Sequence, residues 1–280
     1  MIKIFIVTYN NPEDLNSNVD SLLCSDILNY PHEIYIINNH SNFELLYKVT
    51  GVLHNDVRPD FSTGHLARNW NQAIINGFGS LSSPQADIVV AVQDDVLFKH
   101  QWASYIQDKH QTYSFITAGV GDAFCSYTPD AVKKIGLWDE RFCNIGYQEA
   151  DYFLRALIYN KEKSSINDLA HNRTLNELPY NFFYGTFDVR GHGGNDSIIT
   201  VPPRNTARHA NHLISANNYH KISQYVYETK WGIETPERDW TVEYKNGNHP
   251  TNSKTLNYIY YPYFERDIEN LKDKNYAVRD

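Results

Sequence analysis

The 280-residue sequence contains only three cysteines, Cys24, Cys125 and Cys143, and none of them has the short spacing of a metal-binding pair. An odd number of widely spaced cysteines argues against a disulfide framework and against a zinc–cysteine site. We therefore expect isolated thiols in a reducing compartment, and a fold stabilised by a hydrophobic core.

Long hydrophobic runs and an excess of positive charge are also missing. No window approaches the roughly 20 apolar residues that a membrane-spanning helix needs, and the apolar run at residues 2–8 is too short for a signal peptide. The net charge is −8, with 25 Lys and Arg against 33 Asp and Glu, which argues against nucleic acid as a partner. We expect a cytoplasmic protein without a transmembrane segment.

Strand and helix patterns alternate over the first hundred residues. Apolar runs predict strands at 2–9, 32–38, 51–56 and 86–95. Asn11, Pro12 and the acids that follow predict a helix from residue 12 to about residue 24, with Asn11 as its N-cap. Apolar spacing predicts a second helix within 63–79, stopped by Gly77 and Gly79. This alternation indicates an α/β fold with a mainly parallel sheet.

Later segments give weaker signals. Helices are predicted at 129–136, 146–159 and about 203–231, and a strand is predicted within 181–191. The last part of the chain, 233–280, is rich in tyrosine and has little periodicity. We expect this part to be an extension rather than a second domain.

Polar residues follow several predicted strands where those strands end. Ligands of parallel α/β sheets bind beyond the carboxyl ends of the strands, and Asn10, Asn38 and the pair Asp94–Asp95 occupy such ends. Two adjacent carboxylates would repel each other if buried, so the pair suggests a bound cation. Taken alone, "QDD" fits a solvated strand-to-loop turn better than a cation site.

Seven motifs occur in a characteristic order over residues 2–232: "FIVTYN", "YIINNHS", "GHLARNWNQAI", "QDDV", "GLWDERFCNIGYQEADYFLR", "VRGHGGNDS" and "YETKWG". Together they resemble the family-two glycosyltransferases of the GT-A fold. The resemblance implies a GT-A (Rossmann-like) domain at 1–232, with a mixed, mainly parallel sheet flanked by helices, and a helical C-terminal extension at 233–280 packed on it.

The resemblance also implies an activity. The protein would transfer a sugar from a nucleotide-sugar donor, UDP-linked by default, to a hydroxyl acceptor such as a glycan, with inversion and with Mn²⁺ or Mg²⁺. Asp95 would bind the metal and His192 would lie beside the metal and diphosphate, while Asp94 would reach the ribose or a metal-bound water. The remaining candidate nucleotide contacts are Thr8, Tyr9, Asn10, Asn38, Arg68, Asn69 and Gln93.

Two acids are candidates for the chemical step. Glu149 takes the place of the family's catalytic base, at a predicted helix start where the helix dipole favours a carboxylate. Asp151 would assist it or cap the helix. Three amides stand where the family has acids: Asn38, Gln93 and Gln148.

Two other functions are compatible with the sequence. The three amides raise the alternative of a non-catalytic module that binds nucleotide sugars or carbohydrates. A sugar nucleotidyltransferase would favour a glycine-rich, basic loop after the first strand, whereas this chain has the acidic "YNNPEDL" there. His192 and Arg68 also fit an ordinary solvated loop and helix surface.

Overall fold

The computed structural model describes residues 1–9, 11–39, 42, 44–55, 66–119, 122–142, 148–149, 151–152, 182–184, 194–195 and 198–202. The helix predicted at 203–231 and the extension at 233–280 lie outside these residues. Within the described residues, no helix has both the length and the apolar character needed to cross a bilayer.

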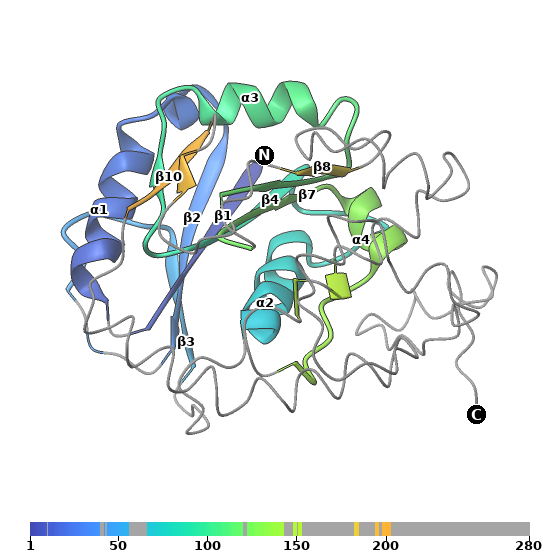
Figure 1. The fold of residues 1–280 in the computed structure, drawn as a ribbon, viewed down its shortest axis with the longest axis horizontal. Helices are drawn as coiled ribbons and strands as arrows, with labels where there is room; N and C mark the ends of the chain where they lie inside the picture. The colour runs from blue at the N-terminus through green and yellow to red at the C-terminus, as the bar shows by residue number, and fades with distance from the viewer. Residues whose placement is uncertain are drawn as a thin grey trace.

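The centre of the molecule is a seven-stranded sheet (Figure 1). Its strands are, in spatial order, β3 (Gly51–Asn55), β2 (His32–Asn39), β1 (Ile2–Thr8), β4 (Ile88–Gln93), β7 (Phe124–Tyr127), β6 (Phe115–Ala118) and β8 (Phe182–Tyr184). Strand β1 pairs in parallel with β2 and β4, as β2 does with β3 and β6 with β8, whereas β7 is antiparallel to both neighbours. This confirms the predicted mixed, mainly parallel sheet.

Helices cover both faces of this sheet (Figure 1). Alternate residues of β1 point to opposite sides: Ile4 belongs to the core shared with α1 (Pro12–Leu23), α3 (Trp102–Lys109) and the short 3₁₀ helix η1 (Asp26–Asn29). Phe5 belongs to the core shared with α2 (Leu66–Phe78) and α4 (Pro129–Ile135). A strand covered on both faces is a nearly continuous apolar run, and every residue of β1 is buried, including its one charged residue, Lys3.

The helix starts show how local and distant residues combine. Helix α1 begins where predicted, but the Asn11 side chain makes no capping bond and instead donates to the Asp14 carboxylate at 2.6 Å. Helix α3, which the sequence did not predict, is capped from η1. Both carboxylate oxygens of Asp26 accept main-chain N–H bonds, from Ala103 at 3.0 Å and from Ser104 at 2.9 Å.

Gly77 does not stop α2, contrary to the prediction, because it lies inside the helix and the chain leaves the helix at Gly79, where φ is +62°. Gly77 lets α2 lie close to the sheet. A Cβ at this position would overlap Val89 Cγ2 and would come within 3.2 Å of Phe5 Cε2. The missing side chain therefore sets the distance between α2 and strands β1 and β4.

A Gly77→Ala substitution should destabilise the protein by about 1–3 kcal/mol, because overpacking outweighs the gain in helix propensity. Val89 is fully buried and branched at Cβ, so it cannot swing aside easily. Urea unfolding would measure the change. Adding Val89→Ala should remove the clash, and Asn76→Ala on the exposed side of the same helix is the control. Equal stability of Gly77→Ala and wild type would contradict the close approach.

A second, three-stranded sheet joins distant parts of the chain. Strand β10 (Ile199–Val201) pairs antiparallel with β5 (Leu97–Phe98) and with β9 (Gly194–Asn195). Strand β5 begins two residues after Asp95, and β9 begins two residues after His192. The small sheet therefore ties the chain just after His192 to the chain just after the acidic pair.

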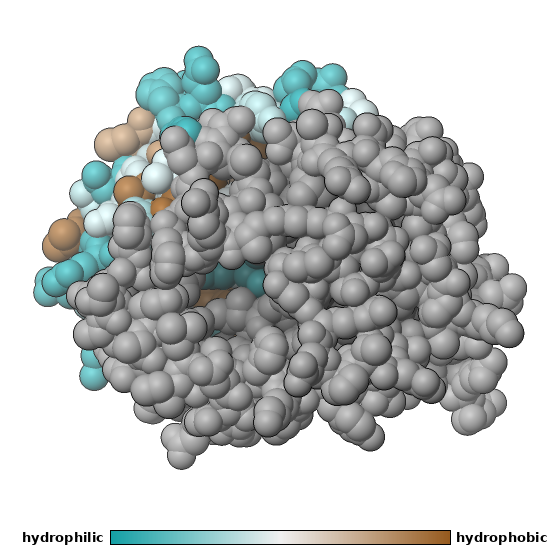
Figure 2. Space-filling view, in the orientation of Figure 1, coloured by the Kyte–Doolittle hydropathy of each residue, from teal (hydrophilic) through white to brown (hydrophobic). Residues whose placement is uncertain are grey.

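The described surface is mainly polar. Where these residues are visible in Figure 2, over α1 and α3, hydrophilic residues dominate and hydrophobic ones are scattered among them. The exposed large hydrophobic side chains are Met1, Tyr9, Leu28 and Leu46. Of the two cysteines in the described part, Cys24 is exposed and Cys125 is buried, and both are free thiols, as expected.

Candidate functional site

The candidate site lies where the order of the sheet reverses. Strand β1 has β2 on one side and β4 on the other, so successive strands are added in opposite directions from this point. Such a switch point leaves a crevice at the carboxyl ends of its strands. Thr8 ends β1 and Asp94 directly follows β4, and the Thr8 hydroxyl donates to Asp94 Oδ2 at 2.7 Å. The Asp94 N–H also donates to the Val7 carbonyl at 3.1 Å.

The acidic pair forms the tip of a turn. The Val96 N–H donates to the Gln93 carbonyl at 3.3 Å, which places Asp94 and Asp95 at the two central positions of a β-turn. Val96, the last residue of the turn, is fully buried in the core, while both acids are half-buried. The apolar strand thus ends by presenting two carboxylates at the carboxyl edge of the sheet, next to the switch point.

Gln93, the residue before this pair, points toward another acid. Its Nε2 donates to Asp122 Oδ1 at 3.1 Å. Asp122 lies between β6 and β7 and is almost completely buried. Asp122 is not among the site residues predicted from the sequence. The available signal was an isolated acid among glycines and apolar residues in "TAGVGDAF", a pattern comparable to the acid at the end of β4.

Glu149 and Asp151 lie in helical residues 148–149 and 151–152, named here the acidic helical segment. Both carboxylates are buried, with exposed fractions of 3% and 0%. Burial raises the pKa of the Cys125 thiol well above its usual value, and the negative charges of Asp122 and Glu149 raise it further. Glu149 itself directly follows Gln148, whose side-chain Nε2 donates to Asp122 Oδ2 at 2.9 Å.

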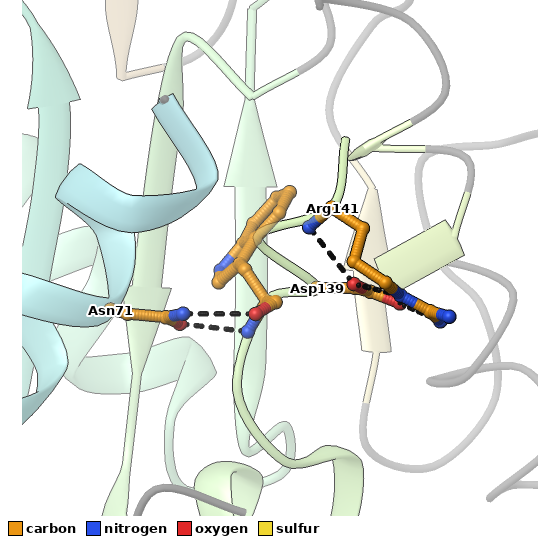
Figure 3. Close-up of polar contacts among 4 residues, drawn as sticks. Asn71, Asp139 and Arg141 are labelled. Carbon is orange, nitrogen blue, oxygen red and sulfur yellow. Dashed lines mark hydrogen bonds and ion pairs between the residues drawn. The ribbon is translucent and has the colours of Figure 1, made fainter. Parts of the chain in front are cut away.

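The acidic helical segment is tied to the chain that leads into it. The Trp138 ring stacks on Tyr152, with centroids 4.2 Å apart and planes 7° apart. Figure 3 shows the Asn71 amide of α2 facing the main chain of Trp138, where it donates to the carbonyl at 2.9 Å and accepts from the N–H at 2.8 Å. Three residues after Trp138, the Arg141 guanidinium donates two hydrogen bonds to the Asp139 carboxylate and forms an ion pair with it.

Among the described residues, the ends of β2 and β3 contribute mainly amide side chains. Asn38 is buried and lies 3.3 Å from His54 Nδ1. Asn55 Nδ2 donates to Asn39 at 2.8 Å and makes a longer contact, 3.5 Å, with Asn69 at the start of α2. These amides line the side of the site away from the acidic pair.

The remaining predicted contacts fall in different places. Tyr9 is exposed beyond the end of β1, and Arg68 is exposed on the first turn of α2. Asn10 and His192 lie outside the described residues. The structure therefore brings Thr8 to Asp94 and Gln93 to Asp122, and it links Glu149 to Asp122 through the preceding residue, Gln148.

The donor set at the turn suits a hard divalent cation. Within the described ranges, no cluster of three histidine, cysteine or acidic side chains could hold a metal by itself. Mg²⁺ and Mn²⁺ sites, however, are often built from one or two carboxylates completed by substrate phosphates and water. The adjacent carboxylates of Asp94 and Asp95 fit that arrangement.

No family model and no curated protein matches this sequence. Three solved structures illustrate what the fold is similar to. Mannosyltransferase PcManGT from Pyrobaculum calidifontis, in complex with GDP-Man and Mn²⁺, is 10% identical over 98% of this chain and 79% of its own, with a TM-score of 0.46. S. aureus TarS 1-349 in complex with UDP-GlcNAc is 11% identical over 56% and 53%, with a TM-score of 0.39.

The third, the catalytic domain of Drosophila beta1,4galactosyltransferase 7 in complex with xylobiose, is 11% identical over 57% of this chain and 61% of its own, with a TM-score of 0.38. The chain spans about half the length of the TarS 1-349 structure that it matches. What this site can do follows from its own residues.

Proposed function

We propose that this protein is a glycosyltransferase that moves a sugar from a nucleotide-sugar donor to a hydroxyl of a glycan-type acceptor, with inversion and with the help of Mn²⁺ or Mg²⁺. The observation that supports it best is the Thr8–Asp94 hydrogen bond across the switch point. It fixes a carboxylate in the crevice where α/β sheets bind nucleotides. The motif order of the sequence supplies the reaction class.

The acidic turn would bind the donor through its diphosphate. Asp95 would hold the cation together with diphosphate oxygens, and Asp94, oriented by Thr8, would reach the ribose or a metal-bound water. A bound cation would supply positive charge next to the leaving diphosphate. His192, which the chain places two residues before β9, remains the candidate for a further contact to the metal or the diphosphate.

The nucleoside would lie on the amide side of the site, near Asn38 and Asn69. Uncharged amides both donate and accept hydrogen bonds, so they can bind a base or a ribose without a charge preference. Uracil is the default base. Tyr9, Asn10 and Arg68 are further candidates for nucleotide contacts.

Glu149 would serve as the base of a single displacement. The acceptor oxygen attacks the anomeric carbon, the bond from that carbon to the diphosphate oxygen breaks, and Glu149 takes the acceptor's proton. Burial excludes water from the carboxylate, and the helix dipole favours its charged form. Asp151 would assist. A double displacement would need a second nucleophile near the sugar.

UDP should stabilise the protein strongly only when Mn²⁺ or Mg²⁺ is present. Ligand at about 100 times its dissociation constant adds about 2.7 kcal/mol to the folded state. Because Asp95 and diphosphate oxygens would share one cation, Asp95→Ala should abolish the metal-dependent part of the shift. A thermal melt with UDP, Mn²⁺, both or neither measures it.

The matched control is Asp108→Ala, which removes an exposed acid on α3, away from the end of β4. This variant should keep the full shift. A metal-dependent shift of wild-type size in Asp95→Ala would place the nucleotide elsewhere.

Hydrolysis of donors separates a transferase from a binding module. Purified protein with Mn²⁺ would be offered a panel of UDP- and GDP-sugars, and release of the nucleoside diphosphate would be followed. Slow hydrolysis of at least one donor is expected, because water can replace the acceptor. Binding without any release would favour the non-catalytic module.

A further inference from the structure

The buried carboxylate of Asp122 connects the two acidic parts of the site. It accepts hydrogen bonds from three side chains on three different elements. Oδ1 accepts from Gln93 Nε2 at 3.1 Å, and Oδ2 accepts from Trp70 Nε1 at 2.6 Å and from Gln148 Nε2 at 2.9 Å. These donors belong to the end of β4, to α2 and to the acidic helical segment.

Each donor is neutral, and this determines which residues fit around Asp122. Burying a carboxylate is costly unless donors surround it, and Asp122 is 1% exposed. A glutamate at position 93 or 148 would bring a second carboxylate against it in place of an N–H group. The Asp122 carboxylate therefore favours glutamine over glutamate at both positions. The two amides need not indicate a site that has lost its function.

Each glutamine directly precedes an acid of the candidate site. Gln93 is followed by Asp94 and Asp95, and Gln148 is followed by Glu149. Gln148 is held from both ends, because its Oε1 also accepts the Ala67 N–H of α2 at 3.2 Å. Moving Asp122 would shift both acidic segments together.

We propose that Asp122 is a positioning residue, which sets the distance between the acidic turn after β4 and Glu149 by holding Gln93 and Gln148 on its two oxygens. The inference rests on the proposed function, since it assumes that one end binds the donor and the other takes the proton. Reactions that need two groups in register lose rate when one of them moves by about 1 Å.

The hydrogen-bond donor and acceptor can be exchanged between residue 93 and residue 122 without disturbing the other contacts of Asp122. Asp122→Asn can place its new NH₂ group at the Oδ1 position and keep an oxygen at the Oδ2 position for Trp70 and Gln148. Combined with Gln93→Glu, the hydrogen bond to residue 93 is restored with donor and acceptor exchanged. Gln93→Glu alone places two carboxylates in contact.

Melting temperature and donor hydrolysis would be measured for wild type, both single variants and the double variant, at one neutral pH. The donor is the nucleotide sugar that wild type hydrolyses fastest in the panel above. Gln93→Glu should lower both the melting temperature and kcat, the latter about tenfold or more, with KM changed far less. The double variant should recover most of both losses. Asp26→Asn, a buried acid that caps α3, should lower only the melting temperature.

The outcomes are distinct. Recovery of both quantities in the double variant supports the positioning role. Recovery of melting temperature alone makes Asp122 purely structural and overturns the inference, as would a Gln93→Glu variant with unchanged or higher kcat. A wild-type protein that hydrolyses no donor would instead reject the proposed function, and the positioning role with it.

Discussion

A Glu149→Gln variant should fold normally and transfer sugar about 10²–10⁴ times more slowly, the usual cost of losing general-base catalysis. Glutamine keeps the size and most of the hydrogen bonding of glutamate but cannot take a proton. In the proposed function the donor binds at the acidic turn and not at Glu149, so nucleotide affinity should stay within a few-fold. Transfer kinetics with saturating donor, and the anomeric configuration of the product by NMR, measure the effect.

Stability provides the internal control for this variant. Glu149 is buried, and its charge raises the pKa of the Cys125 thiol, so neutralising it removes a charge from the interior and should not lower the melting temperature. Glu13→Gln, an exposed acid in the first turn of α1, is the control for activity. Near-normal transfer by Glu149→Gln, or a product with retained configuration, would exclude the single displacement through Glu149. If Asp151→Asn is equally inactive and folded, the base could be either acid.

Acid should destabilise the protein through His110, at the C-terminal end of α3. Its Nδ1 lies 2.9 Å from the Tyr113 carbonyl, which can only accept, so Nδ1 carries the proton and Nε2 accepts from the Ser126 hydroxyl at 2.7 Å. Burial lowers the pKa of His110 from 6.5 to about 4, and the hydrogen bond to the Tyr113 carbonyl opposes this only partly.

The direction of the effect follows from proton binding. Between pH 6.5 and about pH 4, the unfolded chain holds a proton on His110 that the folded chain does not. The stabilisation is therefore complete above pH 6.5 and is lost as the pH falls toward 4. Each pKa unit corresponds to about 1.4 kcal/mol. Because part of His110 still reaches solvent, we expect the free energy of unfolding to fall by about 2–3 kcal/mol, which is less than the whole pKa shift would give.

Urea unfolding at several pH values between 7 and 4 would measure this loss. His110→Gln cannot titrate, so its stability should depend less on pH by about the same amount. His32→Gln is the matched control, because His32 at the start of β2 is half-buried, as His110 is, and its Nδ1 also bonds a main-chain carbonyl, that of Tyr30. Identical pH slopes for wild type and His110→Gln would show that the histidine is not held neutral.

The sequence predicted the first four strands and helices α1, α2 and α4, because long apolar runs, proline starts and helical spacing are local signals. Strands β6 and β7 were missed. Each has four residues, and the turn between them gives no strong hairpin pattern. Helix α3 was missed because its cap, Asp26, lies 77 residues before Ala103, so no local pattern marks its start.

The site shows the same difference between local signals, which could be predicted, and long-range contacts, which could not. Positions at strand ends, such as Thr8, Asn38 and Asp94, could be predicted from the alternation of strands and helices. The bond from Thr8 to Asp94 and the contacts of Asp122 could not, since each joins residues at least 26 positions apart. Resemblance to a family identified Gln93 and Gln148 as departures, and only their shared partner explains why an amide suits both positions.

Helix α2 contacts Asp122, the acidic helical segment and the chain that leads into that segment. Within five consecutive residues it supplies the Ala67 N–H to Gln148, the Trp70 indole to Asp122 and the Asn71 amide to Trp138. Inserting or deleting one residue among these five would turn the remainder of the helix by about 100° and separate these contacts. During divergence, changes in chain length can therefore accumulate in the connecting loops, whereas the length of this stretch of α2 must stay constant.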